Sequence, residues 1–202
     1  RLPQADAFVR QGLWAKGSMP LATKLSGLRL GIVGMGRIGQ AIATRALAFG
    51  MPIAYTARSN KPDLPYTFFA SVKELASQVD VLTLITPGGA STHHMVNAEV
   101  LQALGPTGYL INVARGSVVD EVALVHALST HVIAGAGLDV FEHEPYPHAQ
   151  LLALDNVILT PHVGSATDST RQAMADLAAL NIERYFANEP VETPVPECSN
   201  RK

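Results

Sequence analysis

An α/β fold with a doubly wound parallel sheet is predicted by two features of this sequence. Short apolar runs alternate with segments of helical periodicity along most of the chain, which is the pattern of successive βα units. One apolar run also ends in a glycine cluster, and a helical pattern follows it directly. Because runs that are apolar throughout are typical of strands covered on both faces, the sheet is expected to be parallel and buried.

The expected elements follow one another in a regular order. The first strand leads from Leu28 to Gly34, and the helix after it carries apolar residues at positions 38, 41, 42, 46 and 49. Further strands are expected at 52–56, 66–69, 81–85, 109–113, 132–138 and 157–160. Helices are expected at 71–77, with Ser71 as N-cap, and at 98–104, 121–128 and 169–187. Functional side chains should follow the strand ends, because parallel strands end at one edge of a sheet.

Three parts are expected along the chain. Residues 1–27 form an N-terminal helical arm and linker, residues 28–188 form a dinucleotide-binding domain, and residues 189–202 form an extended tail. Trp14, in the arm, either contacts a partner subunit or covers the edge of its own domain. The chain begins without Met and in a helix-like pattern, so we expect a further segment upstream of it.

Composition narrows the range of partners. The 202 residues are 48% hydrophobic and 16% charged, with a formal net charge of -2 and no basic run, so we expect neither nucleic acid nor a membrane surface as a partner. Apolar runs stay well below the roughly 18 residues of a membrane span. The single cysteine, Cys198, excludes an internal disulfide framework and indicates a reducing compartment, so we expect a cytoplasmic protein.

The glycine cluster has the form G-x-G-x-x-G, at Gly34, Gly36 and Gly39. Between a strand and a helix, these glycines allow a tight turn, a close approach of a pyrophosphate to the backbone, and close packing of the helix on the strand. Arg37 and Ile38 lie in the same turn and are expected cofactor contacts. This stretch therefore predicts a Rossmann-type dinucleotide site.

The end of the second strand indicates which dinucleotide is bound. An acidic residue about 20 positions beyond the glycines usually holds the adenosine ribose, but residues 51–61 contain neither Asp nor Glu. Arg58, Ser59 and Lys61 stand there instead, and such side chains suit a ribose 2′-phosphate. The sequence thus favours NADPH over NADH, while a solvated basic turn remains the alternative.

Polar clusters follow the last three strands, and each contains one candidate catalytic residue: Arg115, Glu144 or His162. An arginine that binds an anion, a histidine that donates a proton and a carboxylate that orients the histidine are the groups needed to reduce a ketone beside a carboxylate. Taken singly, each could instead be a surface ion-pair residue, a turn cap or a structural histidine. The other six histidines are expected to be solvated, and their spacing predicts no metal site.

Four motifs in this order closely resemble the D-isomer-specific 2-hydroxyacid dehydrogenases, and the turn with Arg58, Ser59 and Lys61 resembles that of their NADPH-preferring glyoxylate/hydroxypyruvate reductase branch. The motifs are L-R-L-G-I-V-G-M-G-R-I-G, I-N-V-A-R-G-S-V-V-D-E, A-G-L-D-V-F-E-H-E-P and L-T-P-H-V-G-S-A-T. The resemblance covers nearly the whole chain, but it corresponds only to the cofactor-binding domain of a two-domain enzyme. The substrate domain, which precedes it in the family, is absent from this sequence.

The resemblance implies roles for individual residues. Arg115 would orient the substrate, His162 would be the acid/base, and Glu144 would be its partner; formate dehydrogenases of this fold carry Gln at the position of Glu144. Asp139 would lie at the nicotinamide end. The cofactor contacts that the resemblance implies are Thr86, Pro87, Val113, Ala114, Arg115, Asp139, His162, Gly164 and Ser165.

The function implied is that of an oxidoreductase that transfers a hydride from NADPH to a small 2-ketoacid, such as glyoxylate or hydroxypyruvate, and forms the D-2-hydroxyacid. The alternative is a nucleotide-sensing protein of the dehydrogenase-like corepressor type, which resembles the same family. The family also implies a homodimer. Without the substrate domain, the 202 residues alone are expected to bind cofactor and to reduce ketoacids negligibly.

Overall fold

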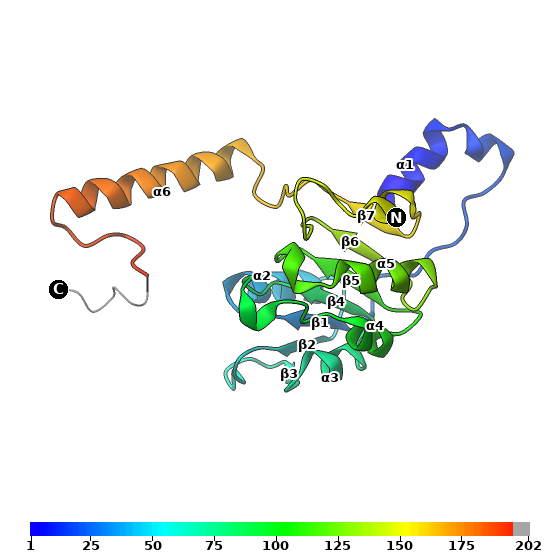
Figure 1. Ribbon diagram of the computed structural model, residues 1–202, viewed down its shortest axis with the longest axis horizontal. Coiled ribbons are helices and arrows are strands. Elements are labelled where there is room, and N and C mark those ends of the chain that lie inside the picture. Colours follow the sequence, from blue (N-terminus) through cyan, green and yellow to red (C-terminus); the bar gives the residue numbers. More distant parts are fainter. Residues whose placement is uncertain (196–202) are drawn as a thin grey trace. The chain divides into compact units, whose positions relative to one another are not determined.

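A seven-stranded sheet in which all neighbouring strands are parallel forms the centre of residues 1–162, as a computed structural model that describes residues 1–195 shows (Figure 1). The strands are β1 (Leu30–Val33), β2 (Ile53–Thr56), β3 (Thr67–Phe68), β4 (Val81–Leu84), β5 (Tyr109–Asn112), β6 (Gly135–Leu138) and β7 (Val157–Leu159). Their order across the sheet is β3-β2-β1-β4-β5-β6-β7. The order reverses between β1 and β4, and ligands of such sheets bind beyond the carboxyl ends of the strands at this point. The predicted fold class is confirmed.

Helices or short 3-10 segments connect successive strands, except that a loop alone joins β2 to β3. The α-helices are α1 (Leu2–Arg10), α2 (Arg37–Leu47), α3 (Val72–Ala76), α4 (Ala98–Leu104), α5 (Glu121–Ser129) and α6 (Asp168–Phe186), and the short 3-10 segments are η1 (Leu13–Lys16), η2 (Ala90–Thr92), η3 (Gly116–Val118) and η4 (Ala149–Ala153). Ser71 is the N-cap of α3, as predicted. Its hydroxyl accepts a hydrogen bond from the backbone of Glu74, whose carboxylate accepts one from the backbone of Ser71.

Two apolar cores pack the sheet, and they divide the side chains of one strand between them. Leu30 and Ile32 of β1 lie in the smaller core with Ala43 and Ala46 of α2, whereas Val33 lies in the larger core. The larger core includes buried residues of α3, α4 and α5. This division follows the two-residue repeat of a strand and explains why the strands are apolar throughout.

The strand predicted at 132–138 is shorter than expected, because β6 begins at Gly135. Val132 and Ile133 lie in a turn instead, where their backbone N–H groups donate to the carbonyl oxygen of Ala127 near the end of α5. These donations satisfy a carbonyl that the end of the helix leaves unpaired. Ile133 is nonetheless fully buried, so its apolar character reflects packing in the core rather than strand pairing.

The described residues divide into two compact units, residues 1–162 and residues 163–195. The second unit contains α6, and none of the residues of this helix is buried. Met174 and Ile182, two large apolar residues of this helix, are more than half exposed. The domain limits at 27 and 188 stay predictions, and residues 196–202 of the predicted tail, with Cys198, lie outside the described residues.

Within residues 1–195, every helix is too short or too polar to cross a lipid bilayer.

An ion pair links the starts of β1 and β4, at the edge of the sheet opposite the strand ends that carry the predicted site. Asp80 receives hydrogen bonds from Arg29 at 2.7 Å from Nη2, 3.1 Å from Nε and 2.7 Å from the backbone N–H. These contacts hold the pKa of the Asp80 carboxyl below its ordinary value. We expect Asp80→Asn to lower the free energy of unfolding by about 1 kcal/mol at pH 7, a value that allows for solvent screening of a partly exposed pair.

The pH dependence of this loss provides the check. A carboxyl with a lowered folded-state pKa stabilises the fold above its unfolded pKa, and this contribution disappears as the pH falls through the folded value. The free energies of unfolding of the wild type and Asp80→Asn, measured in urea, should therefore differ at pH 7 and converge as the pH falls through the folded-state pKa of Asp80, which lies below the ordinary value of 3.8. Asp6→Asn, which removes a more exposed ion pair with Arg10, is the control and should have a smaller effect. If the wild type and Asp80→Asn still differ equally in their free energy of unfolding at low pH, the stability loss does not arise from the charge of Asp80.

Candidate active site

Four of the predicted functional residues follow four neighbouring strands. Thr86 follows β4, Arg115 follows β5, Glu144 follows β6 and His162 follows β7. A cleft of about 780 Å³ lies at this edge of the sheet. Its lining residues are Pro87, Gly88, Gly89, Arg115, Gly116, Ser117, Phe141, Glu142, Glu144 and His162. The three predicted catalytic residues therefore share one cleft.

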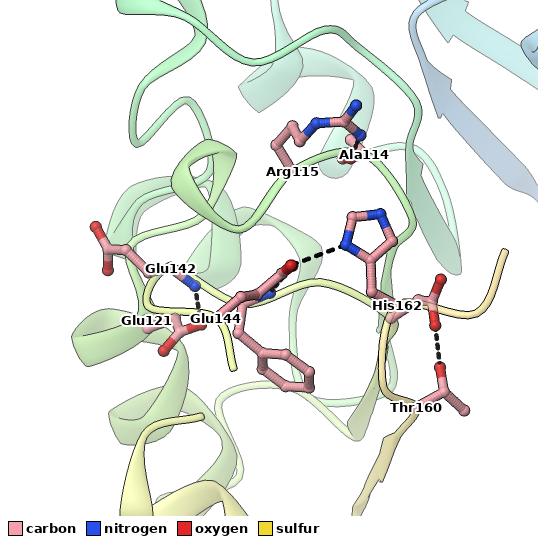
Figure 2. Close-up of polar contacts among 9 residues, drawn as sticks. Ala114, Arg115, Glu121, Glu142, Glu144, Thr160 and His162 are labelled. Atoms are coloured by element: carbon pink, nitrogen blue, oxygen red, sulfur yellow. Dashed lines mark hydrogen bonds and ion pairs between the residues drawn. The ribbon is translucent and has the colours of Figure 1, made fainter. Parts of the chain in front are cut away.

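Glu144 and His162 form a direct pair. The Nδ1 atom of His162 lies 2.8 Å from Oε2 of Glu144, and Figure 2 shows the carboxylate directed at the ring. The other carboxylate oxygen accepts a hydrogen bond of 3.1 Å from the backbone N–H of Phe141. The hydrogen bond from His162 is the main reason why the pKa of Glu144 lies below its ordinary value, and the bond from Phe141 acts in the same direction. Glu144 is therefore an anion at neutral pH.

The backbone at His162 has a left-handed conformation, with φ of +52°. This conformation is uncommon for a residue with a side chain and is found at sites where the surroundings impose it. The N–H of His162 donates to the carbonyl oxygen of Thr160, which closes the turn after β7. Because Nδ1 is bound to Glu144, Nε2 is the ring nitrogen that can donate a proton to a substrate.

Arg115 is held by a buried residue that the sequence analysis did not single out. The side-chain amide of Asn112 donates to the carbonyl oxygen of Arg115 at 3.1 Å and accepts from the N–H of Ala114 at 3.0 Å. The guanidinium of Arg115 donates to the carbonyl oxygen of Ala114, as Figure 2 shows. Asn112 is 1% exposed, and an amide at the end of an otherwise apolar strand is the signal that could have identified it.

Close backbone packing brings the loop of Arg115 to the loop of Glu144. A Cβ atom on Gly116 would lie 1.9 Å from the carbonyl carbon of Phe141, so only glycine permits this approach.

The other predicted cofactor contacts differ in exposure. Val113 and Pro87 are exposed beside these loops. Asp139 is buried, and one of its carboxylate oxygens accepts a 2.6 Å hydrogen bond from the hydroxyl of Thr160. Gly164 and Ser165 belong to the second compact unit.

The glycine turn meets the requirements of a dinucleotide site. Gly34 has φ of +105°, and a Cβ atom on Gly39 would lie 2.2 Å from the carbonyl oxygen of Gly34, so both positions need glycine. A Cβ atom on Gly36, by contrast, would meet nothing within 4 Å. Next to Gly34 in the adjacent strand end, the hydroxyl of Thr86 is buried and lacks a hydrogen-bond partner among the described residues. An open backbone turn and an unpaired buried hydroxyl fit a bound nucleotide.

The turn after β2 presents its basic side chains to solvent. Arg58, Ser59 and Asn60 are exposed, and Lys61 is half-buried. Within residues 1–195, neither Arg58 nor Lys61 pairs with a carboxylate. The two cations are therefore available for an anionic ligand. The turn also lies next to the glycine turn, because β2 is paired with β1.

One histidine expected to be solvated has a specific partner. Nε2 of His94 lies 2.6 Å from Oε1 of Glu142, whose backbone N–H donates to the buried carboxylate of Glu121. The residues are 48 positions apart, so no local pattern could indicate the contact. His93 stacks on His94, with ring centroids 3.9 Å apart. Possible ligand atoms of His93, His94 and Glu142 lie within 4.8 Å of one another. The absence of a metal site stays a prediction.

Comparison with known proteins identifies the family. Residues 1–164 match the model of the D-isomer specific 2-hydroxyacid dehydrogenase, NAD binding domain. The chain belongs to this family. It is 51% identical over 195 residues to a hydroxyphenylpyruvate reductase of Plectranthus scutellarioides and 48% identical over 195 residues to a glyoxylate/hydroxypyruvate reductase of Arabidopsis thaliana. Both alignments cover 96% of this chain and 62% of the relative.

A solved structure agrees with this assignment. An NADPH-dependent glyoxylate/hydroxypyruvate reductase from Sinorhizobium meliloti, crystallised with NADP and malonate, superposes with a TM-score of 0.95 at 50% sequence identity. The match covers 100% of this chain and 64% of that protein. The chain thus spans less than two thirds of the length of the relatives that it matches. It corresponds to their nucleotide-binding part.

Proposed function

We propose that this chain binds NADPH and that the complete protein reduces a small 2-ketoacid of the glyoxylate or hydroxypyruvate type to the D-2-hydroxyacid. The observation that carries the proposal is the presence of Arg115, Glu144 and His162 in one cleft at the carboxyl edge of the sheet, beside the glycine turn. The names of the relatives support this substrate class. The reaction is a reduction in which the carbonyl carbon gains a hydride and its oxygen gains a proton.

Each of the three side chains has a distinct task in this proposal. Arg115 binds the carboxylate of the ketoacid and orients its carbonyl group. His162 holds a proton at Nε2 and donates it to the carbonyl oxygen, while Glu144 fixes the orientation of the ring through Nδ1. Bound NADPH would supply the hydride. The residues that would hold it are the glycine turn, Thr86 and the basic turn after β2, with Asp139 toward the nicotinamide.

The preference for the phosphorylated nucleotide rests on Arg58, Ser59 and Lys61. The Sinorhizobium meliloti relative was crystallised with NADP, which supports this assignment. We expect Arg58→Ala to weaken NADPH binding by about 10- to 100-fold, because a charge-assisted hydrogen bond contributes roughly 1.5 to 3 kcal/mol. NADH lacks the 2′-phosphate, so its affinity should change little. Isothermal titration of both nucleotides into the chain measures the two effects.

Arg45→Ala is the matched control for this experiment. Arg45 is an exposed arginine on α2 whose guanidinium donates to the carbonyl oxygen of Ala41, away from the turn. Its removal changes the net charge as Arg58→Ala does, but it should leave the ratio of the NADPH and NADH dissociation constants unchanged. Equal wild-type affinities for the two nucleotides, or the same ratio in Arg58→Ala, would overturn the assignment.

Turnover distinguishes the reductase from a nucleotide sensor of the corepressor type. The complete protein should reduce glyoxylate or hydroxypyruvate with NADPH, whereas a sensor would bind the nucleotide without turnover. Residues 1–202 alone should show nucleotide binding with negligible reduction. A homodimer formed through this domain, as the family resemblance implies, belongs to the same proposal. The arm around Trp14, which is 70% exposed, would reach toward the partner.

A further inference from the structure

A buried tyrosine lies beneath the basic turn after β2. Tyr55 is in the middle of β2, and it has no exposed surface. Its ring packs against Phe68 of the neighbouring strand, with centroids 5.4 Å apart, and forms part of the smaller core. A phenylalanine would satisfy this packing equally well. The hydroxyl therefore needs another explanation, because a buried polar group is costly unless it is hydrogen-bonded.

The hydroxyl of Tyr55 is bonded to the turn itself. It donates to Oδ1 of Asn60 at 2.8 Å and accepts from the backbone N–H of Lys61 at 2.8 Å. The carbonyl oxygen of Lys61, at 3.4 Å, is a weaker alternative acceptor. One hydroxyl thus uses its single proton and a lone pair on two consecutive residues. These contacts connect the rigid core to the exposed end of the turn.

The anchored residues adjoin those proposed to contact the 2′-phosphate. Lys61 is one of them, and Asn60 directly follows Arg58 and Ser59 in the chain. The turn is exposed, and it contributes little to the core that could fix its shape. Arg58 and Lys61 can bind one phosphate together only if the backbone between them keeps a defined path. Tyr55 provides the buried support for that path.

We propose that Tyr55 is a positioning residue for nucleotide selectivity: its hydroxyl holds the 58–61 turn in the conformation that binds the 2′-phosphate. This inference rests on the proposed binding of NADPH. The hydroxyl does not contact the phosphate itself. It contributes to the difference between NADPH and NADH by preorganising the basic side chains.

Tyr55→Phe removes the hydroxyl and keeps the ring, so it tests the proposal directly. We expect the dissociation constant for NADPH to rise by about 3- to 15-fold, as is usual for the loss of one or two hydrogen bonds, and that for NADH to stay within about twofold. The fragments 2′,5′-ADP and 5′-AMP should show the same contrast, since they differ only in the 2′-phosphate. If the hydroxyl had only a structural role, Tyr55→Phe would weaken the binding of all four ligands to the same extent.

Two further variants complete the experiment. Tyr109→Phe removes a hydroxyl from β5, where it contacts Thr23, and should leave all four dissociation constants unchanged. Asn60→Ala removes one partner of Tyr55 from the exposed turn and should reproduce part of the loss of NADPH affinity, even where Tyr55→Phe does not fold.

The outcomes separate this inference from the function on which it rests. A wild-type chain that binds NADPH and NADH equally would overturn the proposed cofactor preference and, with it, the role of Tyr55. A wild-type preference that is lost in Arg58→Ala but retained in Tyr55→Phe and Asn60→Ala would overturn the positioning role alone. Selective loss of NADPH and 2′,5′-ADP binding in Tyr55→Phe and in Asn60→Ala would support both the proposed cofactor preference and the positioning role of Tyr55.

Discussion

His162→Ala should lower kcat for ketoacid reduction by the complete protein by about 10²- to 10⁴-fold, the usual contribution of a general acid. The expected loss follows from the position of the ring, which lies in the cleft with Nδ1 on Glu144 and Nε2 available to a carbonyl oxygen. Nucleotide affinity should change much less than kcat. Steady-state kinetics with NADPH and glyoxylate, together with binding measurements, separate the two quantities.

His143→Ala is the matched control, because His143 is an exposed histidine next to Glu144 and lies outside the residues that line the cleft. It should retain kcat within about twofold of the wild type, as surface substitutions away from a site usually do. Retention of wild-type kcat in His162→Ala would exclude His162 as the proton donor.

Glu144→Gln tests the second half of the pair. The pKa of Glu144 in the folded protein lies below its ordinary value of 4.5. The carboxylate therefore stays ionised below pH 4.5 and is protonated only when the pH falls through this lowered pKa. Near neutral pH the anion is therefore available to hold the ring of His162 through Nδ1. In Glu144→Gln this charged acceptor is absent, so kcat for ketoacid reduction should fall. Steady-state kinetics of the two proteins at pH 7 measure the effect, and an unchanged kcat would contradict the role of Glu144.

Gly36→Asp should weaken the binding of both NADPH and NADH by at least about 100-fold while the fold is retained. Gly36 is the N-cap of α2, its φ of -82° suits any residue, and a Cβ atom there meets nothing within 4 Å. Aspartate is also a favourable N-cap. Its carboxylate would, however, lie at the turn proposed for the pyrophosphate, where the juxtaposition of like charges costs several kcal/mol. Titration of both nucleotides measures the loss, and thermal unfolding checks the fold.

Gly36→Asn separates charge from size, because asparagine is similar in shape and is an equally good N-cap. It should weaken nucleotide binding less than Gly36→Asp does. Unchanged affinity in both variants would show that the pyrophosphate does not bind at this turn. An equal loss in both would indicate a steric rather than an electrostatic cause.

The sequence by itself determined the fold class and the place of the candidate catalytic residues. The apolar runs and the glycine turn predict βα units, and residues after strand ends meet at one edge because the strands are parallel. Arg115, Glu144 and His162 could therefore be assigned to one site without coordinates. The helix start at Ser71 was also predictable, since a capping box involves only residues that are neighbours in the chain.

Only the tertiary structure decided contacts that depend on how distant segments pack. The pairing of His94 with Glu142 joins loops that are 48 positions apart, and the burial of Ile133 without strand pairing depends on the end of α5. The role of Tyr55 was hidden for a different reason. In the sequence, Tyr55 is one more aromatic residue in an apolar strand, and nothing there indicates which groups its hydroxyl contacts. Periodicity reports which face of an element is buried, whereas hydrogen bonds depend on the position of single atoms after the chain has folded.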